Sequence, residues 1–201
     1  PFSSPAIDDQ ISRKISFDLA KLRARGLLTA DDERTQLAEE YRLIKRPLLA
    51  NAFGANPLPK GNMVMVTSSL PGEGKSFTAI NLAISIAMEL DRTVLLVDAD
   101  VAKPRLPEYL GFRAEHGLLD ILQQGSHDLS KAILRTNIQN LAILPAGKTY
   151  SRATELLASE AMYRLIDDLA NRYPDRLVLF DSPPLLSTSE SSVLASHMGQ
   201  I

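Results

Sequence analysis

The stretch Ser68-Ser69-Leu70-Pro71-Gly72-Glu73-Gly74-Lys75-Ser76 joins an apolar run at 63–66 to an apolar stretch that begins near Lys75. A loop that wraps a polyphosphate must aim several backbone N–H groups at one point, which requires small residues at its tightest bends. Gly72 and Gly74 meet that requirement. Lys75 supplies a cation for the β- and γ-phosphates, Ser76 supplies a hydroxyl for Mg²⁺, and the next helix points its positive end at the anion. The stretch therefore predicts a strand, a phosphate-binding loop and a helix that together hold ATP or ADP with Mg²⁺.

The match to the pattern G-x-x-x-x-G-K-[ST] has one gap, because Ser69 stands where the first glycine is expected. The alternative is a glycine-rich turn before an ordinary helix. The apolar segments on both sides favour the phosphate loop, since the motif requires a strand before it and a helix after it. The residues predicted to contact the nucleotide are Pro71, Gly72, Glu73, Gly74, Lys75, Ser76 and Phe77.

Two further apolar runs, at 93–97 and 177–180, end in carboxylates: Asp98 and Asp100 after the first, and Asp181 after the second. Such runs are typical of buried parallel strands, whose carboxyl ends face a ligand crevice. A carboxylate there can hold Mg²⁺ directly or through water, and another can accept a proton from an attacking hydroxyl. We predict metal contacts from Ser76, Asp98, Asp100 and Asp181. Each aspartate taken singly could instead begin a turn or cap a helix.

The alternation of strands and helices predicts an α/β fold of the P-loop NTPase type, with a mainly parallel sheet covered by helices on both faces. Strands are expected near 63–67, 93–98, 141–144 and 176–181, and helices near 75–90, 117–124, 153–171 and 190–197.

Helices are also expected before the loop. Apolar residues at helical spacing predict an amphipathic helix from Ile11 that ends at Gly26, and acidic residues at 31–33 predict the start of a second helix that runs toward Ala52. Pro47 should kink or interrupt that second helix. We divide the chain into an N-terminal helical segment, 1–56, and a P-loop core, 57–201. The first helix either packs on its own domain or docks on a partner or membrane surface.

Composition limits the class of protein. With 201 residues, 45% of them hydrophobic, the chain is long enough for one well-packed domain. Lys and Arg number 22 against 24 Asp and Glu, for a net charge of −2, and no basic patch is visible, so we expect no nucleic-acid partner. There is no cysteine, no signal peptide and no apolar run near the roughly 20 residues that span a bilayer. These features predict a cytoplasmic protein.

With these motifs the chain resembles the bacterial tyrosine kinases that regulate capsule and exopolysaccharide synthesis, P-loop proteins related to the cell-division and partition ATPases. The resemblance covers most of the chain from about Leu37 and rests on the SSLPGEGKS, VLLVDAD, LFDSPP, GLLDIL and LPAG segments. The partition ATPases carry a second lysine where this chain has Leu70, which favours the kinase branch.

The resemblance implies roles for individual residues. Lys75 and Ser76 match the Walker A residues, Asp98 and Asp100 the Walker A′ pair, and Asp181 the Walker B aspartate. In the family the first Walker A′ aspartate activates the tyrosine hydroxyl, so Asp98 and Lys75 are the expected catalytic residues. The implied activity is an ATP- and Mg²⁺-dependent autokinase that phosphorylates tyrosines of neighbouring subunits. The alternative is a nucleotide-dependent switch or scaffold that assembles with a membrane polysaccharide co-polymerase without significant kinase activity.

The resemblance also implies partners. Glu39, Arg42 and Lys45 match the family's ring-assembly segment, E-x-x-R-x-x-R, and their spacing by threes places them on one helical face. Intrahelical ion pairs on a solvated helix are the alternative reading. A membrane-embedded co-polymerase would recruit the protein to the inner face of the membrane. The family's tyrosine-rich tail is not found before Ile201, so we expect the core to continue beyond it.

Overall fold

The computed structural model describes residues 13–29, 32, 35–125 and 129–201. Its centre is a sheet in the order β1-β5-β2-β4-β3. The strands are β1 (Met63–Val66), β2 (Thr93–Asp98), β3 (Leu134–Arg135), β4 (Leu141–Leu144) and β5 (Arg176–Asp181). All neighbouring pairs are parallel except β3 with β4. The predicted α/β class is therefore confirmed, and the short antiparallel strand β3 is an element that the sequence did not reveal.

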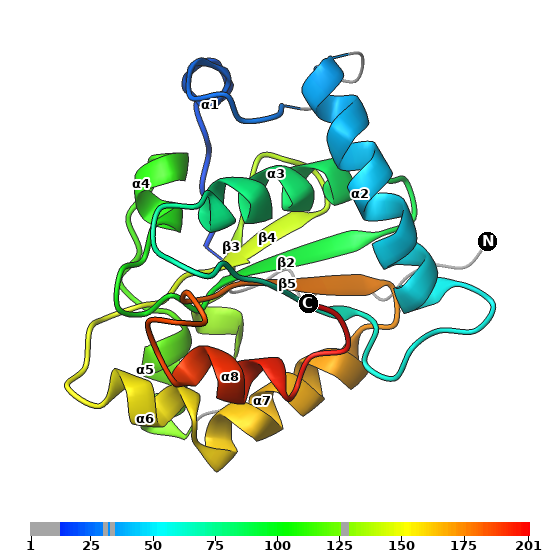
Figure 1. Cartoon of the computed structure of the whole chain (residues 1–201). Coiled ribbons are helices and arrows are strands. Elements are labelled where there is room, and N and C mark those ends of the chain that lie inside the picture. The colour runs from blue at the N-terminus through cyan, green and yellow to red at the C-terminus, as the bar shows by residue number, and fades with distance from the viewer. Residues whose placement is uncertain (1–12, 30–31, 33–34, 126–128) are drawn as a thin grey trace.

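Helices cover both faces of the sheet (Figure 1). The first face carries α1 (Leu19–Ala24), α2 (Gln36–Phe53), α3 (Lys75–Ala87) and α4 (Leu106–Leu110). The second carries α5 (Leu118–Gln124), α6 (Ala153–Leu157), α7 (Glu160–Arg172) and α8 (Glu190–Ala195). In the described part of the chain, no helix combines the length and the apolar character that crossing a membrane requires.

Strands β2 and β5 are buried along nearly their whole length, which is why they read as continuous apolar runs. Their register pairs Thr93 with Arg176 at one end and Asp98 with Asp181 at the other. Because the strands are parallel, the two aspartates lie at the same edge of the sheet, as predicted from the sequence. Strand β1 extends this edge, since Val66 is in register with Asp181.

The predicted first helix is wrong over its first half. Residues 11 and 12 lie outside the described residues, and Lys14 forms a parallel bridge with Arg135 instead of a helical turn. Helix α1 begins only after Asp18, whose carboxylate accepts a hydrogen bond from the Lys21 amide at 3.2 Å. Its predicted end is confirmed, because Gly26 has φ of +76° and stops the helix.

The second helix begins later than predicted. Residues 31 and 33 are outside the described residues, and the Asp32 carboxylate accepts hydrogen bonds from the amide and hydroxyl of Thr29 at 2.8 and 2.6 Å. The cap of α2 is Thr35, whose hydroxyl accepts from the Ala38 amide at 3.2 Å. Helix α2 runs without a break through Pro47, so an interruption there is wrong.

The single helix predicted at 153–171 is two helices. Helix α6 ends at Leu157 and α7 begins at Glu160. Ser159 separates them: its hydroxyl donates to the Leu156 carbonyl at 2.7 Å and accepts from the Met162 amide at 3.3 Å. The spacing of apolar residues continues across this junction, so it did not reveal a serine that caps one helix and bonds to the end of the other.

The N-terminal segment shares a hydrophobic cluster with the P-loop core. Leu22, Leu28 and Tyr41 are buried against α3 and one face of the sheet, in contact with a set that includes Ile80 and Ile84. The boundary at 56/57 stays a prediction. What the structure shows is that burial of α3 depends on side chains from both sides of that boundary.

Candidate nucleotide-binding site

The loop after β1 is shaped to bind an anion. Gly72 and Gly74 have φ of +89° and +93°, a region that residues with a Cβ rarely adopt. Within the described structure, the amide N–H groups of residues 72–77 donate to no protein oxygen. They precede and open helix α3, so several free donors and the positive end of the helix dipole converge on one place.

Glu73 stabilises the loop rather than facing the cavity. Its carboxylate accepts a hydrogen bond from the Leu70 amide at 2.9 Å, which closes the turn before Gly74. The Phe77 side chain packs in the hydrophobic cluster of the first face. Of the predicted contact residues, Pro71, Gly72 and Lys75 line a cavity of about 180 Å³.

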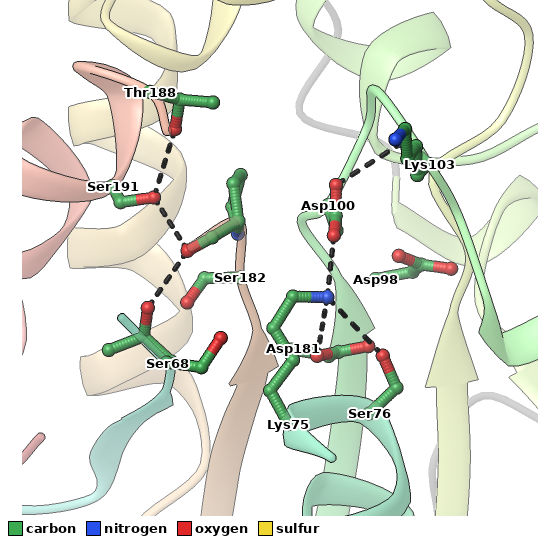
Figure 2. A network of polar contacts seen from close by, with 12 residues as sticks. Ser68, Lys75, Ser76, Asp98, Asp100, Lys103, Asp181, Ser182, Thr188 and Ser191 are labelled. Carbon is green, nitrogen blue, oxygen red and sulfur yellow. Dashed lines mark hydrogen bonds and ion pairs between the residues drawn. The ribbon is translucent and has the colours of Figure 1, made fainter. Parts of the chain in front are cut away.

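Lys75 lies among the carboxylates at the ends of β2 and β5 (Figure 2). Its ammonium is 2.6 Å from Asp100 Oδ2, 4.0 Å from Asp181 Oδ1 and 3.5 Å from the Ser76 hydroxyl. Only 10% of the lysine side chain is exposed. The structure therefore brings Lys75, Ser76, Asp98, Asp100 and Asp181 into one cluster, as the sequence predicted.

Two carboxyls of this cluster, those of Asp98 and Asp181, are hard to ionise. Burial raises the pKa of Asp181 to about 6, although Ser76 and Lys75 act in the opposite direction. Burial, with the negative charge of Asp181, raises the pKa of Asp98 well above its usual value. One Asp98 oxygen accepts from the Leu106 amide at 3.3 Å, and that bond opposes the rise. Desolvated carboxyls of this kind favour binding of a cation or transfer of a proton.

The donor atoms fit Mg²⁺. Asp98 Oδ1 and both carboxylate oxygens of Asp181 are buried without a hydrogen-bond partner. Such atoms are costly unless a cation or water satisfies them. Across the described residues, no group of three or more His, Cys, Asp or Glu side chains is placed to bind one ion. The residues therefore suit a site that the Ser76 hydroxyl and nucleotide phosphates would complete, which is how Mg²⁺ is usually held.

The loop after Asp100 adds cations that the sequence analysis did not assign. Lys103 and Arg105 line the same cavity, and the Lys103 amide donates to Asp100 Oδ1 at 3.2 Å. Their spacing, two residues apart and just beyond an acidic strand end, was the available signal. The cavity lining also includes Asp100 but not Asp98, which is fully buried beneath it.

A set of hydroxyls fixes the opposite wall. The Pro183 carbonyl accepts from Thr67 at 2.8 Å and from Ser191 at 2.7 Å. The Ser191 hydroxyl also lies 3.2 Å from the Thr188 hydroxyl, and Figure 2 shows these two side chains together. The Ser182 hydroxyl donates to the Val66 carbonyl at 2.8 Å. Ser182 thus has a structural role, because its hydroxyl ties the end of β5 to the end of β1.

The residues predicted for ring assembly do not share one exposed face. Arg42 forms an ion pair with Glu39 within the helix. Lys45 is only 5% exposed; its ammonium donates to the Ser85 carbonyl at 2.6 Å and pairs with Glu89 at 2.6 Å. The expectation that Lys45 offers its charge to a neighbouring subunit is therefore wrong for this structure, because its helix turns that side chain toward α3.

Together, the parallel sheet, the loop at the start of α3 and the acidic strand ends define a P-loop nucleotide-binding domain. The sequence model of the AAA domain family matches residues 61–197. The tyrosine-protein kinase YwqD of Bacillus subtilis is 31% identical over 172 residues, which cover 86% of this chain and 69% of that protein. This chain belongs to the bacterial tyrosine-protein kinase family.

Solved structures of a kinase domain and of a related ATPase share this fold. The VpsO kinase domain matches with a TM-score of 0.67 and 30% identity over 85% of this chain and 81% of that one. The septum site-determining protein MinD of Pyrococcus horikoshii, complexed with Mg-ADP, matches with a TM-score of 0.54 and 29% identity over 66% of this chain and 53% of that one.

The chain spans a small part of some relatives. Tyrosine-protein kinase wzc of Salmonella typhimurium is 35% identical over 140 residues, which cover 70% of this chain and 19% of that protein.

Proposed function

We propose that this chain is the catalytic core of an ATP- and Mg²⁺-dependent protein tyrosine autokinase, which phosphorylates tyrosines of neighbouring subunits and regulates exopolysaccharide or capsule polymerisation and export. The observation that carries the proposal is the cluster of Lys75, Ser76 and three strand-end aspartates beside a loop of free N–H donors. Similarity to proteins named tyrosine-protein kinases supports tyrosine as the acceptor of the phosphoryl group.

In the proposed reaction the protein positions the reactants and neutralises charge. The amides of residues 72–77 and the Lys75 ammonium hold the phosphates, and Ser76, Asp98, Asp100 and Asp181 hold Mg²⁺ directly or through water. The metal supplies neutralisation of the charge that develops on the transferred phosphoryl group. When phosphate reaches Lys75, it competes with Asp100 for the ammonium, which frees that carboxylate.

Asp98 is the proposed base that accepts the tyrosine proton. Its raised pKa makes it a stronger proton acceptor once it is ionised. Since Asp100 lines the cavity and Asp98 lies below it, the proton must reach Asp98 past Asp100 or through water. Because Asp100 is nearer to the cavity, the proposal that Asp98 is the base must be tested against Asp100.

The buried position of Asp98 favours one alternative, a nucleotide-dependent switch. In that case ATP binding sets assembly with a membrane-embedded polysaccharide co-polymerase, and phosphoryl transfer is minor. Both functions place the protein in the cytoplasm at the inner face of the membrane through that partner. Both also allow self-association through the exposed residues of α2, among them Glu39.

The test is incubation of the full-length protein with labelled ATP and Mg²⁺, followed by mapping of phosphotyrosine by mass spectrometry. We expect Lys75→Met to lower nucleotide affinity by at least about tenfold, since it removes a charge-assisted contact. We expect Asp98→Asn to retain nucleotide binding and lose about a hundredfold or more in labelling rate.

Lys148→Met changes an exposed lysine outside the cavity and serves as the matched control. If Asp100→Asn loses labelling and Asp98→Asn does not, the base is Asp100. Wild-type protein that binds ATP but labels no tyrosine supports the switch and rejects the kinase.

A further inference from the structure

A second cavity lies at the edge of the sheet opposite the P-loop. It has a volume of about 340 Å³ and is bordered by the amino ends of β2 and β4 and by Arg176, the first residue of β5. In a parallel sheet this edge is far from the carboxyl ends that carry Lys75 and the aspartates (Figure 1). The cavity is therefore separate from the nucleotide site, and its volume is within the usual range of small-molecule pockets.

The decisive group in this cavity is the guanidinium of Arg176. The residue is 5% exposed, yet it forms no ion pair with any carboxylate that the structure describes. Its Nε donates a long hydrogen bond, 3.5 Å, to the Thr93 hydroxyl, and its guanidinium carbon lies 3.9 Å from the centre of the Tyr173 ring. Burial lowers its pKa, which marks the cost of holding this charge out of water.

The negative charge of the neighbouring Asp175 favours the charged form of Arg176, but the two side chains do not form an ion pair in the described structure. Asp175 Oδ2 accepts instead from the Thr93 hydroxyl, at 3.5 Å. An arginine has five N–H donors; in Arg176 the Nε donates to Thr93, and the Tyr173 side chain is a second polar neighbour of the guanidinium. No other nitrogen of Arg176 is among the buried polar atoms that lack a partner, so the remaining donors are open to the cavity that the residue lines.

The walls of the cavity suit a small organic anion. A second guanidinium, that of Arg135, lines the cavity on the side of β3. Leu141 and Ala142 supply apolar surface, and Asn140 supplies an amide. Two arginines on a partly apolar cavity can hold a carboxylate or phosphate by the forked geometry that arginine provides.

We propose that this cavity is a second ligand site, in which Arg176 binds the carboxylate or phosphate group of a small organic anion. The ligand's anionic group lies between Arg176 and Arg135, and its remaining atoms rest on Leu141 and Ala142. The site stands apart from the P-loop, so its occupancy does not depend on the proposed kinase reaction.

The test is isothermal titration calorimetry of the full chain with inorganic phosphate, glucose 6-phosphate and glucuronate as probes. The phosphate and carboxylate probes distinguish the two kinds of anion. Each is titrated into Lys75→Met protein, in which anion binding at the P-loop is weakened, and into wild type. We expect at least one sugar anion to bind equally to both, and Arg176→Gln in either background to lower that affinity by at least about tenfold.

A second variant separates loss of binding from loss of folding. Ala142→Leu fills the cavity while Arg176 stays in place, so it should also abolish binding, with an unchanged circular dichroism spectrum. Arg164→Gln alters an exposed arginine on α7 and should bind as wild type does. The proposal is overturned if no probe binds, if Lys75→Met abolishes all binding, or if the cavity variants bind like wild type.

Discussion

At the scale of single residues, the main feature of the site is the raised pKa of two buried aspartates, Asp98 and Asp181, beside one lysine. Lys75 is 2.6 Å from Asp100 but 4.0 Å from Asp181, so its charge is unevenly shared. Asp181 is left with two buried oxygens that have no hydrogen-bond partner. In the ligand-free protein this carboxylate is therefore a source of instability that a bound cation would relieve.

We predict a pH dependence from Asp181. The pKa of Asp181 is about 6 in the folded state, against an ordinary value of 3.8. Between these two pH values the carboxyl is therefore more protonated in the folded state than in the unfolded state. Its contribution to stability is thus present at low pH and is lost as pH rises toward 6. The free energy of unfolding of Asp181→Asn minus that of wild type should rise by about 2 kcal/mol from pH 4 to pH 6 and level off above about pH 7.

Urea unfolding of ligand-free protein at several pH values measures this difference. Asp91→Asn, at a side chain that is 75% exposed, is the matched control and should stay within about 0.5 kcal/mol of wild type throughout. A difference for Asp181→Asn that does not change between pH 4 and pH 7 would contradict the assigned cause.

At the scale of elements, helix α3 is supported at both ends by different chemistry. Its amino end is left open for an anion, whereas its carboxyl end is closed by the Lys45 ammonium from α2. The Glu89 amide bonds to the Ile86 carbonyl, so the Ser85 carbonyl takes its hydrogen bond from Lys45 instead. A cation at this end of a helix is also favoured by the helix dipole.

We expect Lys45→Met to destabilise the fold by about 1.5 to 3 kcal/mol, since it removes a charge-assisted hydrogen bond and leaves the Ser85 carbonyl unsatisfied. Thermal or urea unfolding measures the change. Arg46→Met, at the next, exposed residue of the same helix, should change stability by no more than about 0.5 kcal/mol. If Lys45→Met instead leaves stability unchanged and disrupts self-association, Lys45 contacts a neighbouring subunit and does not close this helix.

At the scale of the whole molecule, the N-terminal segment and the P-loop core share one hydrophobic cluster. Leu22 and Leu28 are buried on the same face as Ile80 and Ile84 of α3. The Leu28 amide also donates to the Asn81 side chain at 2.7 Å, inside the protein. Loss of the segment would expose the apolar surface of the helix that carries the phosphate loop.

Leu22→Ala should therefore lower the stability of the entire domain by about 2 to 5 kcal/mol. Circular dichroism and binding of a fluorescent ADP analogue should lose their signals at the same, lowered urea concentration. Leu43→Ala, at a side chain that is 69% exposed, is the control and should have little effect. Retention of ADP binding after part of the helical signal has gone would show instead that the two segments unfold separately.

The sequence by itself determined the sheet core and most of the nucleotide site. Glycines at positive φ, apolar runs that end in aspartate and a lysine at a helix start are local signals, because each reflects the chemistry of a few adjacent residues. For this reason the strands at 93–98, 141–144 and 176–181 were predicted with the bounds that the structure has.

Only the tertiary structure decided which groups face one another across the chain. Lys45 of α2 has the spacing of a surface motif, but its side chain points toward α3. Arg176 is the first residue of a strand, but its side chain lines a cavity together with Arg135. Neither outcome follows from local pattern, because the direction of a long side chain depends on which distant element leaves room and charge for it. The physical reason is that burial and desolvation are set by contacts between segments far apart in sequence, and these alone made Asp98 and Asp181 hard to ionise.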